Sequence, residues 1–331
     1  MAALLDIPPL WARSAEQILQ QQWRKVFILG AADCGKSTYC RFLVQRCLEA
    51  GRRVAVLDTD IGQKEIGPPA TLTLGYPQAV QPLTQVPPAA WYFVGTTTPV
   101  GHLLPMTLGV RQLLEVARAS CIIINTTGLV SGPGRILKSY KIEAVQPDII
   151  VALEYGRELR SLLRAYRHYR IVYLPVSKAA TSKSIGERRA VRERAFAAYF
   201  AAAPTVELAW RQVIFQRTLL FSGTRRPSQE FLYVEDTAEG RLVVAPRETV
   251  TTRGARVLPV GFERHLLCGL ANRRNAGVGL GLIMHLDFVR ETLTLRTPVP
   301  VAQIKLVQFG SLYVEPNGRE PGGHVPRGLF V

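Results

Sequence analysis

A glycine-rich loop between two apolar segments constrains the fold of this chain more than any other feature. Residues 30–37 read Gly-Ala-Ala-Asp-Cys-Gly-Lys-Ser and fit the pattern G-x-x-x-x-G-K-[ST] in full. A β-rich apolar run at residues 25–29 precedes the loop, and an apolar-periodic segment at residues 39–50 follows it. In this strand–loop–helix setting, backbone N–H groups and a helix N-terminus can surround phosphate oxygens. The loop therefore predicts a nucleoside-triphosphate site, and an incidental glycine turn is disfavoured because motif and setting agree.

The same pattern gives individual residues a role. Lys36 is expected to reach the β- and γ-phosphates, and the hydroxyl of Ser37 is expected to ligate Mg²⁺. The expected cofactors are thus ATP and Mg²⁺. The residues expected to hold the nucleotide are Gly30, Asp33, Cys34, Gly35, Lys36, Ser37 and Thr38.

Two aspartates, Asp58 and Asp60, end the next predicted strand at residues 53–57. Carboxylates at this point would face the metal and the γ-phosphate. One could hold Mg²⁺ through water, and the other could accept a proton from an attacking hydroxyl. The alternative is that the pair only closes the strand into a turn, which aspartate often does.

Strands and helices alternate along the first 200 residues, and the strands are continuous apolar runs. This pattern predicts an α/β fold of the P-loop NTPase type, with a mostly parallel sheet and helices on both faces. Further strands are expected at residues 91–94, 121–125, 148–153 and 170–175, and further helices at 105–118, 138–145, 158–169 and 184–203. After residue 204 the chain has short strand-like runs and turn signals. We therefore expect a P-loop domain at 1–205 and a smaller β-rich domain at 206–331.

The chain is strongly basic, with 41 Lys and Arg against 25 Asp and Glu and a formal net charge of +16. Residues 131–200 alone hold 14 basic and 6 acidic side chains. Such charge suggests a polyanionic partner, with a general compositional bias as the alternative. A hydrophobic share of 47% is typical of a globular chain rather than a disordered one. No signal peptide or apolar run of membrane-spanning length is evident, and the five cysteines form no CxxC pair. These features favour reduced thiols, a cytoplasmic location and no membrane partner.

Basic residues gather at the start of the last predicted helix of the P-loop domain. They are Lys183, Arg188, Arg189, Arg192 and Arg194. An arginine-bearing lid over the γ-phosphate would stabilise transition-state charge and exclude water. A solvated basic helix face is the alternative. No NKxD-like segment for guanine recognition is found, which weakens a GTPase interpretation.

Together these segments resemble the P-loop polynucleotide 5′-hydroxyl kinases, whose eukaryotic members work in pre-mRNA 3′-end, tRNA and ribosomal RNA processing. The resemblance runs from about residue 23 to 205 and is weaker beyond. It rests on the phosphate loop and its helix, on DTDIGQKEIGPPAT (58–71, the Walker B segment), on GTTTP (95–99, the substrate loop), on NTTGLVSGPG (125–134, the clasp) and on KSIGERRAVRERAFAAYF (183–200, the lid).

The resemblance implies a transfer of the ATP γ-phosphate to the 5′-hydroxyl of RNA, with DNA as a further possible substrate. Asp60 would take the proton of the hydroxyl, and Asp58 and Gln63 would support the metal and the γ-phosphate. Lys183 and Arg188 fall on lid positions where the family usually has Arg. The residues expected at the polynucleotide are Gln63, Thr97, Thr98, Thr127, Gly128, Leu129 and Arg189.

The sequence departs from the family pattern in two places. The clasp usually carries a Trp that stacks on a base, and here that position is Leu129. Stacking is worth about 1–3 kcal/mol per base, so base tolerance is expected to differ. The phosphate loop also begins near the start of the chain, a compact form that resembles prokaryotic members. Two other functions stay open: an ATP-binding scaffold of an RNA-processing complex, and a P-loop GTPase or metallochaperone.

Overall fold

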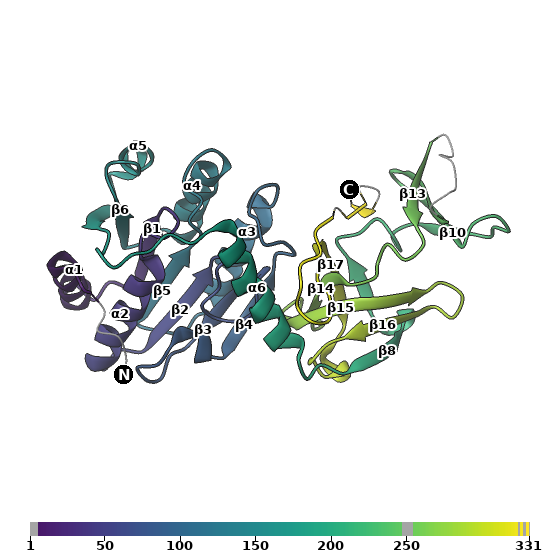
Figure 1. Ribbon diagram of the computed structural model, residues 1–331, viewed down its shortest axis with the longest axis horizontal. Coiled ribbons are helices and arrows are strands. Elements are labelled where there is room, and N and C mark those ends of the chain that lie inside the picture. Colours follow the sequence, from purple (N-terminus) through teal and green to yellow (C-terminus); the bar gives the residue numbers. More distant parts are fainter. Residues whose placement is uncertain (1–5, 247–253, 324, 327–328, 331) are drawn as a thin grey trace. The chain divides into compact units, whose positions relative to one another are not determined.

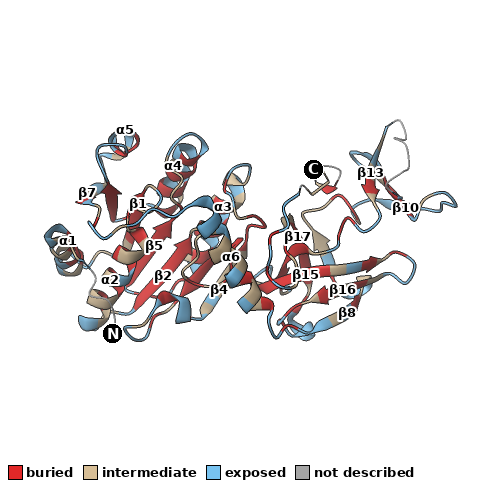
Figure 2. Cartoon of the chain, in the orientation of Figure 1, coloured by how far each residue is buried: buried red, intermediate tan, exposed pale blue. Residues whose placement is uncertain are grey.

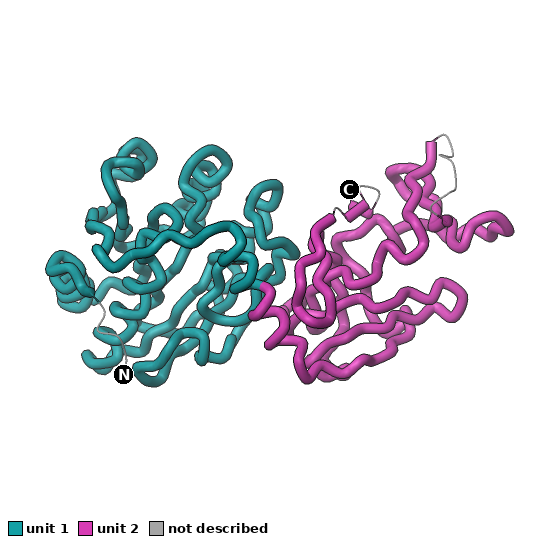
Figure 3. The backbone as a smooth tube through the Cα atoms, in the orientation of Figure 1, with its two compact units in different colours: residues 1–192 teal, residues 193–331 magenta. Residues whose placement is uncertain are grey.

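The computed structural model describes residues 6–246, 254–323, 325–326 and 329–330. The chain divides into two compact units, Met1–Arg192 and Glu193–Val331 (Figure 3). The division falls within helix α6 (Ile185–Phe200), ahead of the boundary expected after residue 205.

The first unit is built on one twisted sheet with the strand order β7-β6-β1-β5-β2-β3-β4 (Figure 1). The strands are β1 (Lys25–Gly30), β2 (Val54–Thr59), β3 (Thr71–Gly75), β4 (Pro88–Phe93), β5 (Cys121–Thr126), β6 (Ile149–Glu154) and β7 (Arg170–Pro175). From β7 to β2 all pairs are parallel, whereas β2–β3 and β3–β4 are antiparallel. The mostly parallel α/β sheet predicted from the sequence is confirmed. Strand β3 is an addition that the sequence pattern did not predict.

Helices cover both faces of this sheet because each central strand is apolar on both sides. Phe27 and Leu29 of β1 pack in one core with α3 (Leu103–Val116) and α4 (Pro133–Val145). Val26 and Ile28 of the same strand alternate to the other face. There they pack with α1 (Pro9–Gln20) and α2 (Lys36–Glu49), and Figure 2 shows the central strands of the sheet coloured as buried.

Two helix predictions need correction. The helix expected at residues 158–169 is only the four-residue α5 (Arg160–Leu163) followed by the 3-10 turn η2 (Arg164–Tyr166). Its many arginines are exposed, so few side chains are available to anchor a longer helix. Helix α1 was not predicted, although Trp11, Ala15 and Ile18 follow a helical spacing and are fully buried.

The second unit is β-rich, as the sequence predicted. One sheet has the order β15-β14-β17-β9, with β16 paired to β15 and β8 paired to β16. A separate four-stranded sheet has the order β10-β11-β12-β13. The strands are β8 (Thr205–Ala209), β9 (Ile214–Gln216), β10 (Thr224–Arg226), β11 (Tyr233–Thr237), β12 (Gly240–Ala245), β13 (Ala255–Pro259), β14 (Leu266–Ala271), β15 (Gly277–Asp287), β16 (Thr292–Arg296) and β17 (Leu306–Tyr313). The core of this unit is a mainly aliphatic cluster that includes Leu266, Ile283 and Val307, and a group of aromatic rings around the partly buried Trp210 packs against it.

No helix in the described part of the chain is both long and apolar enough to cross a membrane. All five cysteines are free and buried.

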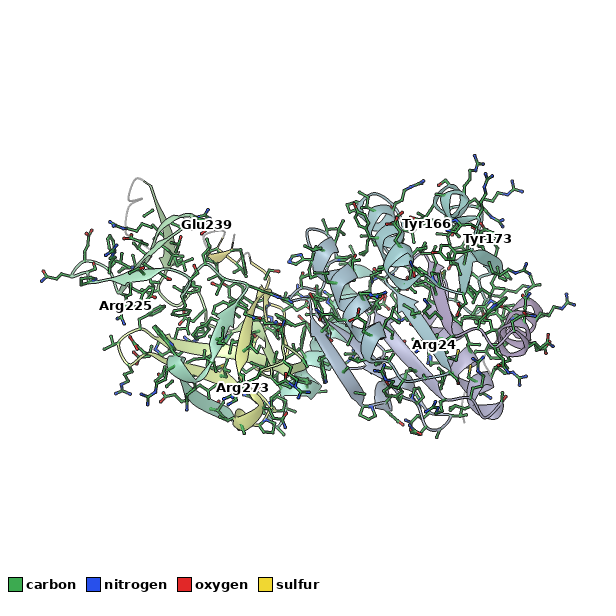
Figure 4. The ribbon with its side chains drawn as sticks, turned by 180° about the vertical axis from the view of Figure 1, so that it is seen from behind. Arg24, Tyr166, Tyr173, Arg225, Glu239 and Arg273 are labelled. Atoms are coloured by element: carbon green, nitrogen blue, oxygen red, sulfur yellow. The ribbon has the colours of Figure 1, made fainter. Side chains whose placement is uncertain are left out.

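The edge strand β7 of the first unit carries Tyr173, and the centre of its ring lies 3.3 Å from the guanidinium carbon of Arg160 (Figure 4).

Candidate active site

The phosphate-binding loop has the backbone that its glycines predict. Gly35 caps helix α2 with a left-handed φ of 87°, a conformation that favours glycine. A Cβ atom at Gly30 would lie only 2.7 Å from the carbonyl oxygen of Leu153 on β6. The indole of Trp11 lies against Gly35, where a Cβ would come within 3.2 Å of its ring. Strand β6 and helix α1 therefore enclose the loop from two sides.

Lys36 lies over its own loop rather than in solvent. Its Nζ donates to the carbonyl oxygen of Ala31 at 2.5 Å, and its side chain is buried. The Sγ of Cys34 is 3.8 Å from the same Nζ, and burial raises the pKa of this thiol despite the nearby lysine. Cys34 is thus a protonated packing residue of the loop, and Lys36 is held where the motif predicts a phosphate.

Backbone groups of its own turn hold one carboxylate oxygen of Asp60. Its Oδ1 accepts hydrogen bonds from the backbone N–H groups of Gly62 and Gln63, both at 3.0 Å. Its Oδ2 has no hydrogen-bond partner among the described residues, and the side chain lines the cavity above the phosphate loop. One oxygen therefore fixes the carboxylate of a side chain that borders the cavity, and the other is left without a protein partner in the described part of the chain.

Asp58 is fully buried, and other groups of the protein contact both of its carboxylate oxygens. Its Oδ2 accepts from the backbone N–H groups of Glu65 and Ile66 at 2.7 and 3.1 Å. The Nζ of Lys64 lies 3.2 Å from Oδ2 and also donates to the Asp58 carbonyl oxygen at 2.8 Å. Burial nevertheless lowers the pKa of Lys64. Asp58 therefore shapes the Walker B segment.

Oxygen atoms suited to Mg²⁺ gather beside Ser37. Glu65 lines the cavity together with Ser37, and burial raises the pKa of this carboxyl group. The Oε1 atom of Gln63 is buried and has no hydrogen-bond partner among the described residues. A hydroxyl, a carboxylate and an unsatisfied amide oxygen are hard ligands that Mg²⁺ accepts. Ser37, Gln63 and Glu65 fit the metal, and Glu65 is a residue that sequence reasoning missed.

The clasp lies directly against the phosphate loop. A Cβ atom at Gly128 would come within 2.6 Å of the Cα of Ala32, so only glycine fits there. Thr127 is buried, and its Oγ1 accepts from the backbone N–H of Leu129 at 3.2 Å. The backbone and side chain of Leu129 pack over Gly134 at the start of α4. The clasp and the phosphate loop thus form one surface.

The substrate loop approaches the Walker B segment from the other side. The carbonyl oxygen of Thr97 would lie 3.1 Å from a Cβ at Gly62. Thr98 is exposed, and its backbone N–H donates to the Oγ1 of Thr96 at 3.3 Å. The structure therefore brings Thr97 beside the site, next to the turn that holds Asp60.

The lid is attached to the phosphate loop through Asp33. The Nη2 of Arg188 forms an ion pair with Oδ2 of Asp33, and the backbone N–H of Lys183 donates to the same oxygen at 3.0 Å. Gln63 donates from Nε2 to the carbonyl oxygen of Arg188 at 3.1 Å. Arg189 is exposed on the following turn of α6. Arg188 thus reaches the loop through its side chain.

These groups surround one cavity of about 530 Å³ within the first unit. Its lining includes Lys36, Ser37, Thr38, Asp60, Gln63, Glu65, Gly128, Lys183 and Arg188. Beyond the loop it continues to Asp6, Trp11 and Ser177, which sequence reasoning did not select. Ser177 donates from Oγ to Oδ2 of Asp6 at 2.8 Å. In the sequence, the helical spacing around Trp11 is the feature that points to this end of the cavity.

Comparisons with known proteins agree with this geometry. The family described as mRNA cleavage and polyadenylation factor CLP1 P-loop matches residues 30–202. The polyribonucleotide 5′-hydroxyl-kinase of Methanocaldococcus jannaschii is 33% identical over 321 residues, covering 90% of this chain and 89% of the relative. That of Pyrococcus furiosus is 31% identical over 338 residues, covering 96% and 95%.

A solved structure shares the fold. A chain in the wild-type Clp1p–Pcf11p complex superimposes with a TM-score of 0.64 at 14% identity, covering 92% of this chain and 78% of the other. The resemblance drawn from the sequence motifs is confirmed by the family match and by relatives similar over nearly their whole length. The chain belongs to the CLP1 P-loop family, together with the archaeal polyribonucleotide 5′-hydroxyl-kinases.

Proposed function

We propose that this protein transfers the γ-phosphate of ATP to the 5′-hydroxyl of RNA, with Asp60 as the base that accepts the hydroxyl proton. The observation that carries the proposal is the single cavity onto which Lys36, Ser37, Asp60 and Arg188 all open. The archaeal relatives named polyribonucleotide 5′-hydroxyl-kinases support the same reaction.

The reaction needs a base, a phosphate clamp and a way to exclude water. The Oδ2 atom of Asp60 accepts the proton as the 5′-oxygen bonds to phosphorus, and the bond from phosphorus to the β,γ-bridging oxygen breaks, leaving ADP. Lys36 and Arg188 stabilise negative charge on the transferring phosphoryl group, since positive groups fixed in advance need no reorganisation. Bound at Ser37, Gln63 and Glu65, Mg²⁺ would neutralise phosphate charge. The lid shields the cavity from water.

Asp58 has a supporting role in this proposal. Its Oδ2 contacts Lys64 and accepts from the N–H groups of Glu65 and Ile66, and its Oδ1 accepts from Asp60 N–H and Asn125 Nδ2. Asp58 therefore fixes the segment that carries Gln63 and Glu65. The metal role expected for Asp58 is therefore exerted through the placement of those two side chains.

The far end of the cavity provides room for the base and ribose of the nucleotide. Trp11, Asp6 and Ser177 line it, beyond the residues that hold phosphate. The Asp6 carboxylate can accept a hydrogen bond from an exocyclic amine, which adenine offers. We place the nucleoside here because the phosphate loop fixes the other end of the triphosphate.

RNA is proposed to reach Asp60 across the clasp and the substrate loop. Gly128 borders the cavity, Thr97 lies against the Asp60 turn, and Leu129 gives the clasp an aliphatic side chain. An aliphatic contact lacks the stacking that an aromatic ring provides. The proposed site therefore holds the terminal nucleotide mainly through its backbone.

The test is transfer of label from γ-labelled ATP to 5′-hydroxyl oligonucleotides of RNA and of matched DNA sequence. We expect labelling of RNA by the wild type and almost none by Lys36→Ala. Wild-type protein that binds ATP tightly without labelling would favour a scaffold role instead. Stronger competition by GTP than by ATP in the binding assay would favour a GTPase or metallochaperone.

A further inference from the structure

Helix α4 buries two lysines on the face that packs against the sheet. The buried positions of this helix are Gly134, Leu137, Lys138, Lys141, Ile142 and Val145. Their spacing is that of an amphipathic helix with its apolar stripe toward the core, and Leu137, Ile142 and Val145 do lie in the hydrophobic cluster. Lys138 and Lys141 occupy the same stripe with 0% of their surface exposed. Charge at such positions calls for an explanation.

Stability of the fold does not explain these lysines. Neither has a carboxylate oxygen within 4.0 Å of its Nζ among the described residues. Burial lowers the pKa of both amines, which shows that the folded state disfavours their charge. Apolar side chains of similar length would usually serve a core at least as well. A function at the ends of these side chains is the better explanation.

Lys141 ends at the turn that carries the proposed base. Its Nζ donates to Thr59 Oγ1 at 2.9 Å and lies 3.4 Å from the Thr59 carbonyl oxygen. Thr59 is the last residue of β2 and directly precedes Asp60. Thr59 in turn donates from Oγ1 to the carbonyl oxygen of Asn125 on β5 at 2.7 Å. Lys141 thus ties the Asp60 turn to α4.

Lys138, one turn earlier on the same helix, ends at the clasp. Its Nζ donates to the carbonyl oxygen of Thr127. Thr127 precedes Gly128, which packs on Ala32 of the phosphate loop with no room for a Cβ. A shift of the Thr127 carbonyl would therefore move the clasp relative to the phosphate loop.

We propose that Lys138 and Lys141 are positioning residues of the kinase reaction, which hold the clasp and the Asp60 turn in register from one helix. The inference rests on the proposed kinase function and adds to it two residues that do not border the cavity. Misplacement of a reacting group by about 1 Å can cost about 10²-fold in rate. A rigid tether from α4 to both segments would prevent such displacement.

The test uses Lys141→Met and Lys138→Met, which keep the length of the side chain and remove the amine. For Lys141→Met we expect kcat to fall by about 10²-fold while KM for ATP changes by no more than about twofold. For Lys138→Met we expect KM for 5′-hydroxyl RNA to rise about tenfold, because the clasp is displaced. Both variants should keep or exceed the wild-type Tm.

Leu137→Ala is the matched control, since Leu137 lies in the same stripe and its truncation opens a cavity without removing a hydrogen bond to either segment. It should lower Tm and leave kcat and KM near the wild-type values well below Tm. Thr59→Val supplies a second test because it removes the Oγ1 acceptor. Combined with Lys141→Met it should lower kcat no further than the stronger single change, since the two substitutions remove the same hydrogen bond between Lys141 and Thr59.

The outcomes separate this inference from the kinase proposal. Wild-type protein that does not label RNA overturns both. If the wild type labels RNA, then wild-type kinetics in both methionine variants overturn the positioning role alone. A fall in kcat that follows a fall in Tm, as a merely structural role predicts, overturns it as well. Loss of kcat or rise of KM at unchanged Tm supports it.

Discussion

Arg188 in the lid and Asp33 in the phosphate loop form an ion pair although 155 residues separate them in sequence. Asp33 also accepts a hydrogen bond from the backbone N–H of Lys183, so one carboxylate oxygen holds both the start of the lid and its arginine. The lid is therefore anchored at the loop that binds phosphate. This places Arg188 beside the proposed γ-phosphate position and makes Asp33 a link between nucleotide and lid.

We expect Asp33→Asn to lower kcat about five- to tenfold, because a partly exposed ion pair contributes about 1 kcal/mol. Asparagine is the suitable change since residue 33 has a φ of 60°, which Asn tolerates better than most residues. Steady-state labelling of RNA measures the effect. A faster enzyme would show instead that the pair restrains Arg188 away from the phosphate.

Asp60→Asn should reduce kcat by about 10²–10⁴-fold, the usual contribution of a general base. The amide oxygen can still accept from Gly62 and Gln63, so the turn and ATP binding should persist. Single-turnover labelling and the ATP-induced shift in Tm check the two parts. Asp58→Asn is the comparison, because it weakens a buried network and should lower Tm itself. Full activity of Asp60→Asn would require another base.

Gly128→Ala should impair the site because the new methyl group would overlap the Ala32 backbone, with Ala32 N only 2.7 Å away. We expect a loss of ATP-induced stabilisation and of labelling. Gly156→Ala is the matched control, since the nearest atom to its Cβ would be Glu158 Oε2 at 3.8 Å. Equal behaviour of the two variants would contradict the close packing of clasp and phosphate loop.

The stability of the protein should rise with pH above neutrality through Lys141. Burial lowers the pKa of Lys141 from 10.5 to about 7, against the opposing effect of Asp60 and Asp58. Between these values the unfolded chain binds the proton and the folded chain does not, so the free energy of unfolding increases with pH. Burial also lowers the pKa of Lys64 and Lys138, so Lys141→Met should show a smaller increase than the wild type rather than none. Lys178→Met, at an exposed site, should retain the full increase. Urea unfolding at pH 7 and pH 9.5 measures the difference.

RNA binding should weaken steeply with salt. Exposed basic side chains between residues 131 and 200 are Arg135, Arg157, Arg160, Arg164, Arg167, Arg170, Lys178, Lys183, Arg189 and Arg194. Each phosphate neutralised on a single strand lowers the slope of log K against log salt by about 0.7. Filter binding from low to high salt gives this slope. A binding constant that does not change with salt would mean that the basic excess reflects a general compositional bias rather than contacts with RNA phosphates.

The phosphate site and the alternation of strands and helices could be predicted from the sequence because both depend on local pattern. The left-handed backbone at the start of α2 requires a glycine at position 35, and the phosphate-loop motif that contains this glycine places a lysine at position 36. Continuous apolar runs likewise predict strands buried on both faces. The order of β1, β2 and β5 then brings the Asp60 turn and the clasp together at one edge.

Only the tertiary structure decided what each charged residue does. Asp58 and Asp60 look alike in the sequence, yet the fold buries one beside Lys64 and turns the other to the cavity. Lys138 and Lys141 contributed to the basic excess of residues 131–200, but both are buried and unavailable to RNA. The roles of these charges depend on solvent exposure and on partners distant in the chain. Local sequence carries no information on either, whereas packing determines both.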